Sequence, residues 1–163
     1  MNSQQLLDHI IKPTLEDMGG NYNSKNAQML SLATAAIESK CGYYIKQING
    51  PALGIWQMEP ATEGDIWQNC DALQDDEFNK VVRLMLPQTH DQYFSEALII
   101  APRYACAMAR LKYSMDENAL PFYGSRLKIY RYYKRIYNTP LGASTLKKFN
   151  AAWYECNLDK IIL

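Results

Sequence analysis

The chain has 163 residues, with 17 basic and 17 acidic side chains. This length suits one domain that buries a continuous core without disulfide support. The formal net charge of zero excludes a protein that is drawn to nucleic acid or to an anionic membrane by its overall field, so a partner must be recognised locally.

The N-terminal segment predicts an amphipathic helix that ends at Gly19 and Gly20. Pro13 is expected to kink this helix or to split it. Because the segment lacks the basic start of a signal peptide, we expect synthesis in the cytoplasm without an export signal. No apolar run approaches the roughly 20 residues that a membrane span needs. The apolar stripe of the helix consists of Leu6, Leu7, Ile10, Ile11 and Leu15.

Residues 25–40 predict a second helix, for which Ser24 is a good N-cap. At about 100° per residue, Glu38 projects close to the small residues Ser31 and Thr34. The acid is therefore expected at the edge of the buried face, above a stripe that leaves space over it. An acid that faces a cleft should lie in such a position.

An irregular loop is expected over residues 41–53, where residues 43–48 can pair briefly in a small ribbon. Pro60 suits the first turn of the helix that follows. Glu59, Glu63 and Asp65 lie near the positive end of that helix, which acidic side chains stabilise.

Further helices are predicted over residues 75–86, 103–115, 121–137 and 144–156, with a short one over residues 91–100. The helix over residues 103–115 is expected to be central. The helix over residues 121–137 is basic and aromatic, but the neutral total favours a solvated face over a nucleic-acid interface. We expect an all-α or α-dominated α+β fold, with about seven helices and at most a small β-ribbon, in a monomer with a single domain over residues 1–163.

The chain shows no metal-ligand pattern. Its four cysteines lie far apart without a Cys-x-x-Cys pair, and we expect them to be reduced and mostly buried. His9 and His90 each stand alone. We therefore predict neither a metal site nor a cofactor.

The central part of the chain carries two motifs, and a third follows near the C-terminus. Glu38-Ser39 ends the second predicted helix, and after 14 intervening residues the chain reads GIWQMEPAT over residues 54–62. Later, Tyr137-Asn138 is followed by Gly142. These segments resemble the signatures of the lysozyme-like peptidoglycan glycosidases, specifically the Slt-type lytic transglycosylases. Thr139 and Pro140 stand where the third signature of that family has alanine and glycine. The resemblance covers residues 24–70 well and residues 125–150 weakly.

The resemblance implies a lysozyme-like fold and cleavage of peptidoglycan between N-acetylmuramic acid and N-acetylglucosamine. Glu38 would first act as the acid and then, as the base, deprotonate the C6 hydroxyl of the sugar, while the substrate's own N-acetyl group stabilises the positive charge. The product would carry a 1,6-anhydro end. By the same resemblance, the residues that orient the acid, hold the saccharide or shape the cleft are Ser39, Ile55, Gln57, Thr62, Tyr137 and Asn138.

The chemistry of glycoside cleavage gives an independent reason to single out Glu38. The leaving oxygen must be protonated, and partial burial keeps a carboxylic acid protonated near neutral pH by disfavouring its charged form. If water attacks instead, a second carboxylate is needed as base, for which Glu59 and Asp65 are better candidates than Glu63. Trp56 is expected to fill the core under the loop rather than to stack on a sugar.

Three functions remain open at this point. The first is a lytic transglycosylase, the second a hydrolytic lysozyme on the same fold, and the third a catalytically inactive saccharide-binding or structural virion protein. Without an export signal, the chain looks like the lysozyme-like domains of bacteriophages, which are either endolysins released through a membrane lesion or virion components that open the cell wall.

Overall fold

The computed structural model describes residues 1–87, 96–139 and 142–163. These residues form an all-α fold in which no strand is present. The ribbon expected over residues 43–48 is reduced to two isolated antiparallel bridges, Lys46 with Leu53 and Leu53 with Met58.

The first predicted helix is continuous but changes its winding. It consists of α1 (Ser3–Leu6), a π-helical stretch (Leu7–Ile11) and α2 (Lys12–Met18). Pro13 lies in the first turn of α2, directly after the wider π-helical stretch, so the proline does not split the helix. The helix ends at Gly19, whose φ of 68° places it in the left-handed region.

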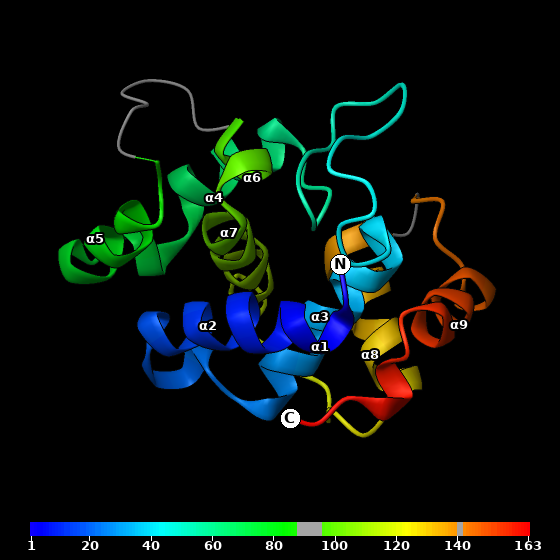
Figure 1. Cartoon of the computed structure of the whole chain (residues 1–163). Helices are drawn as coiled ribbons and strands as arrows, with labels where there is room; N and C mark the ends of the chain where they lie inside the picture. Colours follow the sequence, from blue (N-terminus) through cyan, green and yellow to red (C-terminus); the bar gives the residue numbers. More distant parts are fainter. Residues whose placement is uncertain (88–95, 140–141) are drawn as a thin grey trace.

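Two buried helices form the centre of the molecule (Figure 1). α3 (Lys25–Ser39) packs against α7 (Pro102–Ser114), and the helix formed by α1 and α2 crosses both. Ser24 caps α3, because its hydroxyl accepts the Ala27 N–H at 3.1 Å. α7 is buried along nearly all of its length, which confirms that this helix is central.

The other helices surround this pair (Figure 1). α8 (Arg126–Tyr133) and α9 (Leu146–Glu155) pack on α3, and α8 runs on into a second π-helical stretch, Lys134–Asn138. α4 (Pro60–Asn69) and α5 (Asp76–Leu84) pack on α7, as does α6 (Ala97–Ile100). Short 3₁₀ turns occupy Gly20–Tyr22, Asp71–Gln74 and Leu158–Lys160.

Two predicted helices have different bounds in the structure. The helix expected from residue 121 begins at Arg126, because residues 121–125 form a turn in which the Tyr123 N–H donates to Asn26 Oδ1 at 2.9 Å. Of the short helix expected over residues 91–100, α6 is the described part, and residues 91–95 lie outside the described residues.

The loop over residues 40–59 is anchored at Gly54 and Trp56. Gly54 has a φ of 73°, and a Cβ atom there would lie 2.0 Å from the carbonyl oxygen of Leu98. Trp56 is 1% exposed, and its indole N–H donates to the Ser31 carbonyl at 3.0 Å. Trp56 therefore belongs to the core, as predicted.

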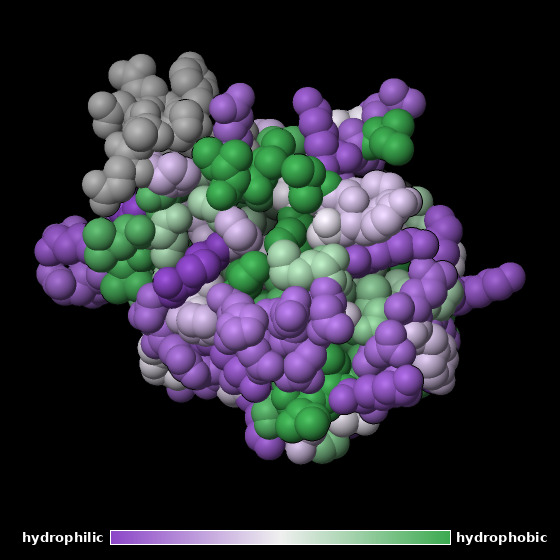
Figure 2. Space-filling model, viewed as in Figure 1, coloured by the Kyte–Doolittle hydropathy of each residue, from purple (hydrophilic) through white to green (hydrophobic). Residues whose placement is uncertain are grey.

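The surface and the thiols complete the description. Polar residues cover most of the face shown in Figure 2, and apolar residues gather around α6. The cysteines are free thiols and mostly buried, as predicted, with Cys156 partly exposed. Among the helices described, none has the length and apolar character needed to cross a membrane.

Candidate active site

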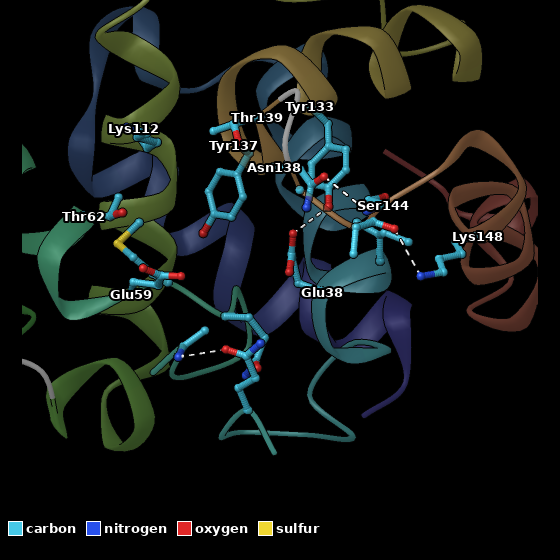
Figure 3. Close-up of a pocket in the computed structure, with 17 residues that line it drawn as sticks. Glu38, Glu59, Thr62, Lys112, Tyr133, Tyr137, Asn138, Thr139, Ser144 and Lys148 are labelled. Atoms are coloured by element: carbon cyan, nitrogen blue, oxygen red, sulfur yellow. Dashed lines mark hydrogen bonds between the residues drawn. The ribbon is translucent and has the colours of Figure 1, made fainter. Parts of the chain in front are cut away.

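Glu38 lies in the last turn of α3 and faces a cleft of about 590 Å³ (Figure 3). The α3 backbone ends directly after Ser39, because Lys40 and Cys41 adopt left-handed conformations with φ of 51° and 56°. The walls of the cleft come from the loop before α4, from α7, from the second π-helical stretch and from the segment that leads into α9. Segments far apart in the sequence therefore meet around one carboxyl group.

The carboxyl group of Glu38 is mostly buried and receives one strong hydrogen bond. The hydroxyl of Tyr133 donates to Glu38 Oε1 at 2.6 Å (Figure 3). Burial raises the pKa of Glu38 to about 7, while the Tyr133 hydrogen bond opposes this rise because it favours the carboxylate. A substantial fraction of Glu38 is thus protonated at neutral pH, as a general acid requires.

Tyrosine rings support the acid from beneath. The ring of Tyr133 lies 6.2 Å from that of Tyr137, which lies 5.4 Å from that of Tyr113. The Tyr113 hydroxyl is bonded to the hydroxyl of Thr34 at 2.6 Å, one α3 turn before Glu38. These rings remove water from one side of Glu38, and this desolvation is the cause of its raised pKa.

The raised pKa of Glu38 has a consequence for stability. The folded protein holds the proton of Glu38 up to about pH 7, whereas the unfolded chain releases it near pH 4.5. The free energy of unfolding therefore falls as the pH rises through this window. Since Gln is neutral throughout, we expect Glu38→Gln to be more stable than wild type at pH 8, by up to about 3 kcal/mol.

Urea unfolding at pH 4 and at pH 8 measures this effect. At pH 4 the two proteins should have nearly the same free energy of unfolding, because both side chains are neutral there. Equal stabilities at pH 8 would contradict a buried, high-pKa carboxyl group at this position.

Ser39 and Ile55 do not line the cleft. The Ser39 hydroxyl is buried, donates to the Ile55 carbonyl at 2.5 Å and accepts the Gly42 N–H at 2.8 Å. Ser39 therefore ties the end of α3 to the loop. Ile55 is 6% exposed, and its carbonyl is already occupied by Ser39.

Gln57 and Thr62 both line the cleft. Gln57 has a φ of 45°, and its side-chain amide donates to the Gly54 carbonyl at 2.7 Å. This hydrogen bond braces the loop, so the amide nitrogen is engaged within the protein. Thr62 lies in the first turn of α4 and presents a polar side chain to the same cleft (Figure 3).

Tyr137 and Asn138 reach the cleft from the second π-helical stretch (Figure 3). The Tyr137 hydroxyl donates to the Trp56 carbonyl at 2.8 Å, which links this stretch to the loop. Asn138 Oδ1 accepts from Lys134 Nζ at 2.7 Å. Gly142 packs tightly here, since a Cβ atom would lie 2.1 Å from the Asn138 carbonyl oxygen. Glu38, Gln57, Thr62, Tyr137 and Asn138 are thus brought together.

The acids proposed as a second carboxylate lie in different surroundings. Glu59 is exposed and lines the cleft. Asp65 does not line it and instead accepts from Asn69 Nδ2 at 2.8 Å. Glu63 is buried against α7, where it accepts from the Tyr104 hydroxyl at 2.5 Å, and burial raises its pKa. Among the described residues, Glu59 is therefore the one acid besides Glu38 that lines the cleft.

Sequence reasoning missed Tyr133, which makes the direct contact with the acid. Tyr133 is one of the tyrosines that recur at near-helical spacing in the predicted helix over residues 121–137. The spacing to Tyr137 places both rings near one face. The approach of that face to Glu38 depends on packing between α8 and α3, which spacing alone does not reveal.

Comparisons of the chain with protein-family models, with curated proteins and with solved structures found no match.

Proposed function

We propose that this protein is a lysozyme-like enzyme that cleaves the glycan strands of peptidoglycan by the lytic transglycosylase reaction. The observation that carries the proposal is the Glu38 carboxyl group, buried on one side by tyrosine rings, open to a cleft on the other, with a pKa of about 7. Glu38 would donate its proton to the bridging oxygen between N-acetylmuramic acid and N-acetylglucosamine. As a carboxylate, it would then accept the proton of the C6 hydroxyl as that oxygen closes the 1,6-anhydro ring.

Two features support a mechanism with one acid. The described acids Glu63 and Asp65 are engaged elsewhere, and Glu59 is exposed rather than sheltered. A carboxylate in open solvent has little reason to act as a strong base. The hydrogen bond from Tyr133 suits both halves of the reaction, because it stabilises the carboxylate form that must remove the second proton.

Mass spectrometry of digested cell walls tests the proposal. Muropeptides with 1,6-anhydro ends are the expected products of purified wild-type protein. Reducing ends would instead show hydrolysis, with Glu59 in the cleft as the candidate base. In that case Glu59→Gln should abolish activity, whereas a transglycosylase should tolerate this change. Intact glycan strands after prolonged digestion would favour an inactive saccharide-binding or structural protein.

Tyr133→Phe tests how the hydrogen bond tunes the acid. Removing the hydroxyl takes away the interaction that lowers the pKa of Glu38, so this pKa should rise further. We expect the alkaline limb of the pH–rate profile to move to higher pH, while the rate at pH 6 falls about tenfold because the carboxyl group loses its fixed orientation. The measurement is kcat/KM on solubilised glycan strands from pH 4 to pH 9.

Tyr130→Phe is the matched control, because Tyr130 lies on α8 but does not line the cleft. It should leave the profile unchanged. A shift of the Tyr133→Phe profile toward lower pH would contradict the role given to Tyr133.

The resemblance to the lysozyme-like domains of bacteriophages indicates where the protein would act. We propose an endolysin or a virion-associated lysin of a bacteriophage, which reaches the cell wall through a membrane lesion or from the particle. Lysis of permeabilised cells by the purified protein, together with its presence in or absence from purified virions, distinguishes the two.

A further inference from the structure

The charged groups around the cleft are unbalanced, although the whole chain has a net charge of zero. Among the described residues, four acidic or basic side chains line the cleft, namely Glu38, Glu59, Lys112 and Lys148. Glu38 is largely neutral below pH 7, and Glu59 is exposed, so solvent screens its charge. With Lys112 and Lys148 set against Glu59, the side chains that line the cleft carry an excess of positive charge below pH 7.

Lys112 is a cation of the cleft wall that has no carboxylate partner among the described residues. It lies near the end of α7 and is only partly exposed. Within the described part of the chain, no carboxylate lies within ion-pair distance of its ammonium group, while five other cations each have one. An anionic ligand in the cleft would give the ammonium group of Lys112 the counter-charge that the described part of the chain does not supply.

Lys148 provides a second, weaker positive charge on the opposite wall. It projects from α9, is exposed, and donates to the Ala143 carbonyl at 3.1 Å. In Figure 3, Lys112 and Lys148 lie on either side of Glu38. A saccharide that places its scissile bond at Glu38 would therefore pass between two cations.

We propose that Lys112 is a specificity-determining residue that binds a carboxylate on the lactyl arm of a muramyl residue. This inference rests on the proposed function and adds to it the charge of the preferred substrate. Muramyl residues differ from N-acetylglucosamine by that arm, which ends in a free carboxylate or continues into an acidic peptide stem. The ammonium group of Lys112 selects strands that carry either form over neutral ones, and Lys148 adds a solvent-screened contribution.

Three forms of one glycan preparation test this assignment. The first keeps its peptide stems, the second has lost them and carries free lactyl carboxylates, and in the third those carboxylates are converted to neutral methylamides. We expect Lys112→Met to lower kcat/KM about tenfold on at least one of the two carboxylate-bearing forms. On the methylamide form the loss should stay below about twofold. Whether the loss falls on the first or the second form identifies the carboxylate that is bound.

Two further variants serve as controls. Lys147→Met removes one positive charge from α9, next to Lys148, at a position that does not line the cleft. This variant should behave like wild type on all three forms. Lys112→Arg keeps the positive charge and should retain the preference for carboxylate-bearing strands. An equal loss by Lys112→Met on charged and neutral strands, or no loss on charged ones, overturns the assignment.

Binding measurements separate this inference from the proposed reaction. Calorimetry in the Glu38→Gln background reports the affinity for the same strands without cleavage. If wild type cleaves none of the three forms, the proposed function fails, and the Lys112 assignment then stands only if Lys112→Met weakens binding of carboxylate-bearing strands about tenfold. The assignment is overturned if the Glu38→Gln protein binds carboxylate-bearing strands with the same affinity with and without Lys112→Met, or if neither protein binds them.

Discussion

Glu38→Gln should lower the rate of peptidoglycan cleavage by about 10³-fold while the protein stays folded. The amide has nearly the shape of the carboxyl group and can still accept the hydrogen bond from Tyr133, so the cleft should keep its geometry. It has no proton to give to the leaving oxygen and cannot remove one from the C6 hydroxyl. The measurement is release of soluble muropeptides from purified cell walls at pH 6.

Asp65→Asn is the matched control for this variant. It removes a carboxylate from α4 that does not line the cleft, and we expect activity within about twofold of wild type. Circular dichroism and urea unfolding show whether each variant is folded. If Glu38→Gln is folded and clears cell-wall suspensions as fast as wild type, Glu38 is not the catalytic acid.

Gly54→Ala should be the most destabilising change by a single methyl group within residues 54–62. The new Cβ atom would lie 2.0 Å from the Leu98 carbonyl oxygen, and a φ of 73° is unfavourable for any side chain. We expect the free energy of unfolding to fall by roughly 2–4 kcal/mol, because the loop must move away from the segment that contains α6. Cleavage should also fall, since the same loop positions Gln57 and Met58 in the cleft.

Gly64→Ala provides the comparison within the same region. Gly64 lies inside α4, and a Cβ atom there meets no atom within 4 Å. Alanine favours helices more than glycine does, so this variant should be as stable as wild type or more stable by up to about 1 kcal/mol. Thermal or urea unfolding of both variants decides the matter, and a Gly54→Ala protein as stable as Gly64→Ala would contradict the close approach to Leu98.

Periodic patterns predicted the helices well where local signals were strong. The start of α3 was predicted from Ser24 and the start of α4 from Pro60, because capping and proline geometry act over a few residues. The start of α8 was wrong by five residues, since a tertiary hydrogen bond to Asn26 holds residues 121–125 in a turn.

The candidate site was predictable in part. The motif located Glu38, Gln57, Thr62, Tyr137 and Asn138, and all of them line one cleft. The roles of Ser39 and Ile55 were not predictable, because their engagement with each other depends on the path of the loop. Tyr133 and Lys112 were missed for a related reason: both come from helices far from the motif in sequence, and only packing brings them to the acid or the cleft.

The wide turn at Lys134–Asn138 sets the direction in which two side chains of the cleft point. Successive residues of an α-helix are rotated by about 100° around the axis, and a helix closed by hydrogen bonds to the fifth residue turns less at each step. If this stretch tightened to ordinary winding, Tyr137 would stay near the face of Tyr133, whereas Asn138, five residues after Tyr133, would swing far around the axis. Asn138 can therefore share one cavity with Tyr133 and Tyr137 because the helix is locally underwound between them.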